Sequence, residues 1–193
     1  MKRIFNFALA GFAAAALAIS MGAMGPAFAQ MNEKTVTVGG APMYPSKNIV
    51  QNAVNSKDHT TLVAAVKAAG LVPTLESPGP FTVFAPTNDA FAKLPAGTVD
   101  TLLKPENKAQ LTKILTCHVV AANAMSSAIS KMIKDEGGMH QVKTVGGCVF
   151  TAKLNGDKIV LIDGKGNQAT VTLANVKQSN GVIHVIDTVL LPG

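Results

Sequence analysis

The clearest pattern in the chain is an eleven-residue segment, FTVFAPTNDAF (81–91), that changes from strand-like to helix-like periodicity. Its first four residues are β-branched or aromatic on both faces, which predicts a short buried strand. Pro86 lacks the N–H group that a sheet ladder needs, so we expect the strand to end there. Thr87 or Asn88 then supplies a side-chain oxygen that caps a short helix burying Phe91.

The rest of the pattern places helices mostly in the first half of the chain and strands mostly in the second. Apolar residues at helical spacing predict a helix over 61–69, capped by Asp58, Thr60 or Thr61, and Gly70 is a typical residue just after a helix end. Asn155-Gly156 predicts a hairpin turn with positive φ at both residues. This segregation favours an α+β fold over alternating βαβ units. The strands expected after residue 115 are 117–121, 141–145, 148–154, 158–162, 168–176 and 182–190.

Residues 1–29 have the organisation of a cleaved signal peptide. Lys2 and Arg3 precede a long apolar run, and Ala27-Phe28-Ala29 places small residues where a signal peptidase reads. A membrane anchor is the alternative, because the run is long for a signal peptide. No stop-transfer charge follows the run, so cleavage before Gln30 is favoured and no stable membrane anchor is expected afterwards.

The exported chain is expected to be a flexible lead-in over 30–45 followed by a single domain over 46–193. The lead-in is punctuated by glycine and proline, and an added edge strand is its alternative interpretation. Cleavage lowers the formal charge from +6 to +4 and removes Arg3, the sole arginine. Without arginine, and with one tyrosine and no tryptophan, the chain is poorly equipped for nucleic acid.

Cys117 and Cys148 are the two cysteines of the chain. In an exported protein such a pair favours a disulfide, which would close a loop of about thirty residues and stabilise the fold by roughly 3–4 kcal/mol. The alternative is a pair of buried thiols that act as small apolar side chains. The spacing is not that of a CxxC motif, so no redox role is expected.

The segment 81–91, a central CHVV (117–120) and NGVIHVIDTVLLP (180–192) together resemble a fasciclin-type domain. The resemblance extends over 46–192 and indicates a small secreted single-domain bacterial member. It implies a wedge-shaped β-sandwich of about seven strands, with helices packed at one side. One departure is Cys117, since the family pattern has a Tyr-His pair there, so any role of that tyrosine ring does not transfer.

His118 and His184 lie in apolar segments, where a satisfied core histidine is favoured over a metal ligand or a catalytic base. The resemblance implies that His118 hydrogen-bonds a polar corner formed by Thr87, Asn88 and Asp89. Such a bond would hold the histidine neutral and tie the middle of the chain to the first motif.

Catalytic and metal-binding signatures are missing from the sequence. It contains no GxSxG elbow, HExxH helix, phosphate-binding glycine loop or zinc-type Cys/His spacing. The glycine-rich segment 163–168 (DGKGNQ) lacks the alternating acidic ligands of a calcium loop. We therefore expect no enzymatic activity, no cofactor and no metal.

The resemblance implies an adhesion or surface-binding module that recognises a cell-surface, matrix or polysaccharide partner in a secreted or periplasmic location. In animal relatives an Asp-Ile dipeptide before the last motif is implicated in integrin binding. Asn175 and Val176 match it here, with Lys177 following, so the carboxylate is absent; we keep these three as a candidate partner contact.

The alternative function is a structural or stress-related envelope protein, including one that binds a small apolar ligand. An exposed apolar patch near the methionines of 125–139 would favour a partner or ligand site.

Overall fold

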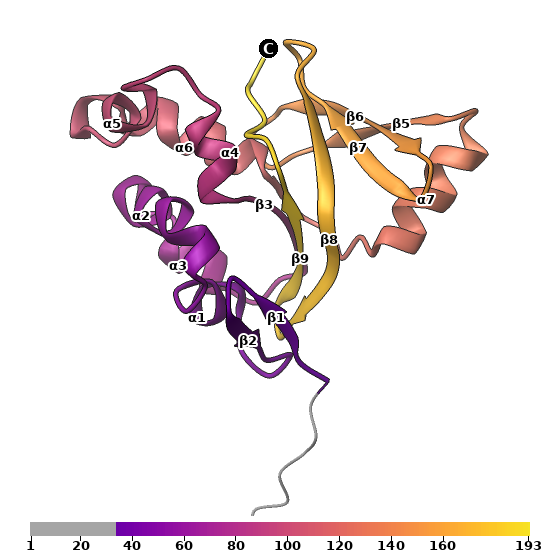
Figure 1. The fold of residues 1–193 in the computed structure, drawn as a ribbon, viewed down its shortest axis with the longest axis horizontal. Coiled ribbons are helices and arrows are strands. Elements are labelled where there is room, and N and C mark those ends of the chain that lie inside the picture. Colours follow the sequence, from indigo (N-terminus) through magenta and orange to yellow (C-terminus); the bar gives the residue numbers. More distant parts are fainter. Residues whose placement is uncertain (1–33) are drawn as a thin grey trace, which may run out of the picture. The chain divides into compact units, whose positions relative to one another are not determined.

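The computed structural model describes residues 34–193 (Figure 1). The expected signal peptide over 1–29 and its cleavage site before Gln30 lie outside the described residues. Within the described part, no helix is long and apolar enough to cross a membrane.

A short hairpin opens the described chain, formed by β1 (Val36–Val38) and β2 (Ala41–Met43). Gly39 and Gly40 both have positive φ and make a two-residue turn, which suits the twist of a hairpin. Val38 and Met43 are buried in the main core. The segment therefore differs from the flexible lead-in expected over 30–45, because alternating apolar residues flank a Gly-Gly turn. Packed structure begins before residue 46.

Helices make up most of the chain between this hairpin and residue 135. The Gly70 backbone is left-handed and ends α2 where the sequence predicts. Asn48 and Gln51 form a capping box at the start of α1. The α-helices are α1 (Ile49–Ala53), α2 (Thr60–Ala69), α3 (Val72–Glu76), α4 (Asn88–Ala92), α5 (Thr98–Leu102), α6 (Lys108–Cys117) and α7 (Ser126–Asp135); η1 (Lys57–His59) and η2 (Pro105–Asn107) are single 3₁₀ turns.

A seven-stranded sheet carries the rest of the fold, in the order β4-β3-β9-β8-β7-β6-β5. β3 and β9 pair in parallel next to the β4 edge, so the two sequence motifs lie side by side although about a hundred residues separate them (Figure 1). All other strand pairs are antiparallel. The strands are β3 (Phe81–Pro86), β4 (Val119–Val120), β5 (Met139–Lys143), β6 (Val149–Asn155), β7 (Lys158–Ile162), β8 (Gln168–Gln178) and β9 (Gly181–Ile186).

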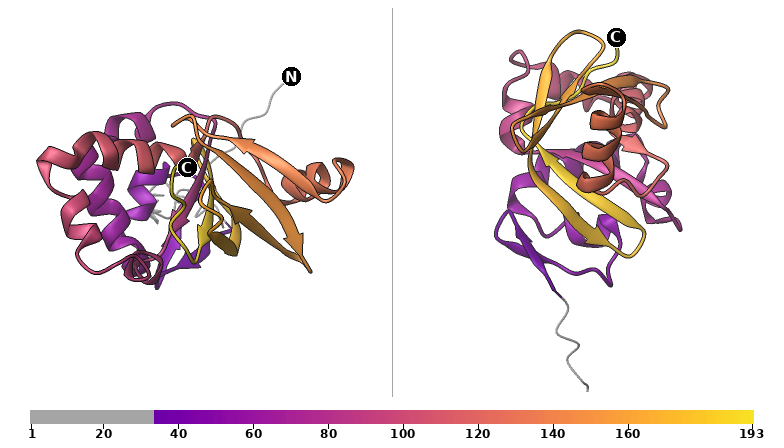
Figure 2. Two further views of the ribbon diagram at one scale, coloured as in Figure 1. Left: turned by 90° about the horizontal axis from the view of Figure 1, so that it is seen from above. Right: turned by 90° about the vertical axis from the view of Figure 1, so that its right-hand side faces the viewer.

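Two hydrophobic clusters form the interior. The larger one packs the helices of the first half against β3 and β9, whose alternate residues Val83, Ile183 and Val185 face it. The second lies beneath α7, which buries Ile129 and Ile133 against the strands of the other half. Figure 2 shows this division, with the indigo-to-pink helices on one side of the central strands and α7 at the opposite end. The α+β prediction, with helices mostly in the first half, is confirmed.

Two local predictions are wrong. Residues 117–121 were expected as a strand, but α6 extends through Cys117 and β4 contains Val119 and Val120 alone. The hairpin between β6 and β7 turns at Gly156-Asp157, because Asn155 pairs directly with Lys158. Of the two turn residues, Gly156 alone has positive φ. A turn of this kind needs positive φ at its first residue, and glycine adopts that conformation without strain.

Candidate functional site

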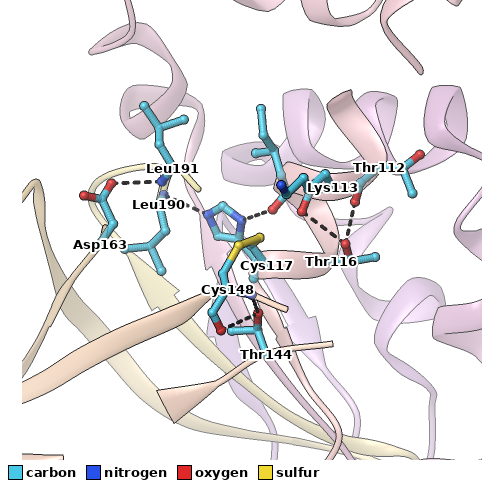
Figure 3. The surroundings of a disulfide bond; sticks show 11 residues. Thr112, Lys113, Thr116, Cys117, Thr144, Cys148, Asp163, Leu190 and Leu191 are labelled. Atoms are coloured by element: carbon cyan, nitrogen blue, oxygen red, sulfur yellow. Dashed lines mark hydrogen bonds between the residues drawn. A yellow bond between two sulfur atoms is a disulfide. The ribbon is translucent and has the colours of Figure 1, made fainter. Parts of the chain in front are cut away.

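A disulfide joins the two halves of the molecule (Figure 3). Cys117 is the last residue of α6 and Cys148 directly precedes β6; their Cα atoms are 5.4 Å apart. Both cysteines are buried. The Cys148 N–H donates to the Thr144 hydroxyl (3.1 Å) and the Thr144 N–H donates to the Cys148 carbonyl (2.9 Å). The cross-link thus fixes the turn between β5 and β6 to the helical side.

His118 does not contact the polar corner, so the hydrogen bond that the resemblance implied is absent. Its Nδ1 lies 2.8 Å from the Ile114 carbonyl, and its Nε2 accepts the Leu190 N–H at 3.0 Å. The reason is that α6 continues to Cys117, which turns the ring toward its own helix and the C-terminal segment. Burial lowers the pKa of His118 to about 4, so the ring is neutral at physiological pH.

The polar corner itself joins two helix starts. The Thr87 hydroxyl accepts the Ala90 N–H (3.2 Å) and caps α4, as predicted for Thr87 or Asn88. The Asn88 side-chain oxygen Oδ1 accepts the Thr61 N–H (3.0 Å), so it caps the first turn of α2. Asp89 is exposed. Thr87 and Asn88 therefore have structural roles, and neither is bonded to His118.

His184 and Asn175 hold the start of α7 against the sheet. His184 Nδ1 accepts the Asn175 N–H at 3.2 Å, while its Nε2 lies 2.8 Å from the Ala124 carbonyl. The Asn175 side chain accepts the Ser126 N–H (2.8 Å) and donates to the Ser126 hydroxyl (2.7 Å). Burial lowers the pKa of His184, which stays neutral. His184 is a hydrogen-bonded core residue, as expected.

Because of this arrangement, little of the candidate partner contact at 175–177 is accessible to a partner. The Asn175 side chain is used inside the molecule, and Val176 is 1% exposed in the main core. Lys177 alone of the three is exposed. A bulge in β8 places Asn175 at φ 62° and lets Val176 point inward, which the sequence pattern did not indicate.

α7 packs on one side of β5 and β6. The opposite side is exposed at β5 and at the start of β6, whereas Val160 of β7, which shares that side through its pairing with Lys153, is 3% exposed. Residues paired across antiparallel strands share a face. Met139 pairs with Lys153, Lys143 with Val149, and Asn155 with Lys158. Met139 is 60% exposed and Val149 45%. We call the set Met139, Lys143, Val149, Lys153 and Lys158 the outer face.

Charge on the outer face has one sign. The positions of β5, β6 and β7 that share this face include three lysines and no aspartate or glutamate. Asp157 lies in the turn at its border. Val145, which is 50% exposed, lies in the turn between β5 and β6. β5 is also an edge of the sheet. Of the methionines at 125–139, whose exposure would favour a partner or ligand site, Met139 alone is exposed, because Met125 and Met132 are half-buried.

No group of three or more histidine, cysteine, aspartate or glutamate side chains that could hold a metal ion occurs among residues 34–193. His118 and His184 each have both ring nitrogens bonded within the protein. The described chain therefore offers no assembled metal centre at the positions that the sequence singled out.

Asp163 has a structural role that its position in the sequence did not indicate. It is 5% exposed and accepts hydrogen bonds from the backbone N–H groups of Lys165 and Asn167. It also accepts the Leu191 N–H (Figure 3). It closes the turn between β7 and β8 and ties that turn to the C-terminal segment. The local DGKGN sequence is typical of an Asx turn, but its long-range bond to Leu191 leaves no sequence signal.

Residues 57–192 match the family described as "Fasciclin domain". The chain belongs to this family. Among its relatives, this fasciclin-domain protein is 46% identical to "Protein sll1483" of Synechocystis over 98% of its own length and 96% of that protein. It is 36% identical to "Immunogenic protein MPB70" of Mycobacterium bovis over 97% of its own length and 94% of that protein.

Animal relatives align over a smaller share of their length. "Transforming growth factor-beta-induced protein ig-h3" of Sus scrofa is 38% identical over 68% of this chain and 17% of that protein. The FAS1 domain pair from the insect cell adhesion molecule Fasciclin I superposes with a TM-score of 0.68 at 18% identity, covering 77% of this chain and 52% of that one. This likeness confirms the predicted fold.

Proposed function

We propose that this fasciclin-domain protein is a non-enzymatic binding module that acts outside the cytoplasm. It recognises an anionic partner at a cell surface or in a matrix, a protein or a polysaccharide. The outer face carries this proposal, because its three lysines stand beside exposed Met139 and Val149 without any carboxylate among them. A one-sign surface attracts partners of opposite charge and repels those of like charge.

The architecture suits the outer face for binding. Its strands are backed by the cluster beneath α7, and the disulfide at Cys148 holds the start of β6. A rigid surface loses little conformational entropy when a partner binds. The edge strand β5 also leaves backbone N–H and C=O groups free to pair with a partner, as in β-strand addition.

The names of two similar proteins support the location outside the cytoplasm that we propose. One 38% identical relative of Mycobacterium bovis is named "Cell surface glycolipoprotein MPB83". The fold neighbour is a cell adhesion molecule by its title. Export through a signal peptide cleaved after Ala29 would bring this chain to a similar place.

The test compares polysaccharide and protein binding of residues 30–193 with that of the variant Lys143→Gln/Lys153→Gln/Lys158→Gln. Biolayer interferometry would use immobilised sulfated polysaccharide, polyuronate, neutral dextran and an acidic matrix protein. We expect saturable binding to at least one anionic surface, none to dextran, and at least a tenfold weaker affinity for the variant.

A matched control removes the same charge elsewhere. The variant Lys104→Gln/Lys108→Gln/Lys113→Gln alters exposed lysines on the helical side. It should keep wild-type affinity at equal ionic strength. Equal losses of affinity in both variants would mean that net charge alone causes the attraction. That result would contradict a site on the outer face. No binding to any surface would favour the structural envelope alternative.

A further inference from the structure

The sequence contains two Asn-Gly pairs, Asn155-Gly156 and Asn180-Gly181. An asparagine followed by glycine is prone to deamidation, because glycine has no side chain to hinder the approach of its backbone nitrogen to the asparagine amide. Both pairs lie where one strand turns into the next, the first between β6 and β7 and the second between β8 and β9. The structure around the two asparagines is different, and it decides which of them is open to this reaction.

Asn180 is held inside the molecule by its side-chain hydrogen bonds. It is 8% exposed, and its Oδ1 accepts the Ile49 N–H at 3.1 Å. Its Nδ2 donates to the carbonyls of Leu75 (2.7 Å) and Ser77 (3.0 Å). Turning this side chain toward the Gly181 nitrogen would leave buried polar groups unpaired, so this pair is protected.

Asn155 has no such restraint. It is exposed at the end of β6, and within residues 34–193 its side chain makes no hydrogen bond. Gly156 follows in the exposed turn with φ 60°. Attack by its nitrogen needs rotation about the Asn155 Cα–C bond, which breaks only the pair with Lys158 at the end of the ladder. Terminal pairs of this kind open at a low free-energy cost.

The reaction at this turn is balanced by water alone. The Gly156 backbone nitrogen loses its proton to solvent and bonds to Asn155 Cγ, while the bond from Cγ to Nδ2 breaks and the amide nitrogen leaves as ammonia. Water then adds to one of the carbonyl carbons of the resulting succinimide and opens the ring. Opening at one carbonyl gives aspartate and opening at the other gives isoaspartate, so either product carries a new carboxylate.

The new carboxylate lies on the outer face. Asn155 pairs with Lys158 and alternates with Lys153 on the same strand, so the three side chains share one side of the sheet. The outer-face positions carry lysines and no aspartate or glutamate. A carboxylate directly opposite Lys158 forms an opposite-charge cross-strand pair and lowers the positive potential of this face.

We propose that Asn155 deamidates spontaneously in the folded protein, whereas Asn180 does not, and that the resulting carboxylate weakens the attraction of the outer face for anionic partners. The charge of this face therefore changes with the age of the protein, without an enzyme. The effect on binding rests on the proposed surface-binding function, but the reaction at Asn155 is independent of it.

Peptide mapping by mass spectrometry follows the reaction directly. The purified exported protein is kept at pH 8 and 37 °C and digested with trypsin, which separates the two sites into peptides 154–158 and 178–193. We expect the mass gain of amide-to-acid conversion to appear in 154–158 at least about tenfold faster than in 178–193, because only the first turn opens readily. In guanidinium chloride, where the fold is lost, both peptides should convert at similar rates.

Asn155→Gln is the matched variant for this reaction. It keeps an exposed amide, but its longer side chain would have to close a larger ring that forms far more slowly. The mass gain in 154–158 should therefore disappear. Equal rates for the two peptides in the folded protein, or no conversion in 154–158 under conditions where the unfolded chain converts, would overturn the proposal.

A second pair of variants tests the effect on binding to dextran sulfate. Asn155→Asp should lower the affinity about threefold, as expected for one exposed charge pair. Asn55→Asp makes the same change at an exposed position just after α1, on the helical side, and should bind like wild type. Wild-type affinity in Asn155→Asp would contradict the effect on binding. A wild type that does not bind dextran sulfate would contradict the surface-binding function, whereas the peptide maps decide the reaction at Asn155 independently.

Discussion

Buried histidines show at the residue scale how the interior of this protein sets side-chain chemistry. His59, His118 and His184 all lie in apolar surroundings that lower their pKa values below the usual 6.5. In each case desolvation of the charged ring is the largest cause. Their neutral rings then act as hydrogen-bonding groups, and at His118 one ring links α6 to the C-terminal segment.

The pH dependence of stability follows from this lowering. The unfolded chain binds protons at its histidines below about pH 6.5 while the folded chain does not, so acid favours unfolding. For His118 alone the stability is complete above pH 6.5 and is lost as the pH falls toward about 4. We expect the free energy of unfolding to fall by about 2–3 kcal/mol on this account.

Urea unfolding at pH 7.5, 5.5 and 4.5 measures the effect. His118→Gln should be less stable at pH 7.5 and should lose less stability on acidification than wild type. Parallel pH profiles for wild type and His118→Gln would contradict the assignment of this loss of stability to His118.

Asn175 offers a second test at this scale. Its backbone is left-handed and its side chain makes two hydrogen bonds to Ser126 at the start of α7. Asn175→Ala should lose these bonds and strain the backbone, lowering stability by about 1–3 kcal/mol in urea unfolding. Asn175→Gly removes the bonds alone and should lose less. Equal losses would leave the bonds, and not the backbone, as the cause.

At the scale of elements, the disulfide connects α6 to the hairpin of β5 and β6. It closes a loop between residues 31 positions apart. Loop-closure entropy predicts a loss of about 3–4 kcal/mol when the bond is removed. Cys117→Ser/Cys148→Ser should therefore unfold at lower urea concentration, and the oxidised wild type should resist alkylation until reductant is added. Two thiols that react at once would contradict the bond.

Several elements could be read from the sequence because their signals are local. The helix predicted over 61–69, its end at Gly70 and the cap at Thr87 depend on neighbours within a few residues. The extent of α6 could not be predicted in this way, because its last residue, Cys117, contacts residues far away in the sequence, among them Cys148. The hairpin turn lies at Gly156-Asp157 and not at the predicted Asn155-Gly156, because the cross-strand register, and not the Asn-Gly pair alone, fixes the turn.

At the scale of the whole molecule, the parallel pairing of β3 with β9 brings the first and last motifs together (Figure 1). The sheet then extends to β5, and its outer face collects lysines from three strands. Long-range attraction by such a face is screened by salt. We expect the affinity for an anionic surface to fall steeply between 50 and 300 mM NaCl, and less steeply for the triple Gln variant of the outer face.

Isothermal titration of one anionic polysaccharide at these two salt concentrations measures this difference. The helical-side control variant should keep the wild-type salt slope. An affinity that is independent of salt would assign binding to the apolar residues Met139 and Val149 instead of the lysines.

The sequence by itself determined the family resemblance, the α+β class, the position of most helices and strands, and the cysteine pair. These depend on periodicity, capping residues and motifs that act over short distances. Only the tertiary structure decided the partners of His118, the burial of Val176, the outer face and the burial of His59. Each of these depends on contacts between segments far apart in the chain, whose geometry is fixed when the sheet closes and the helices pack against it.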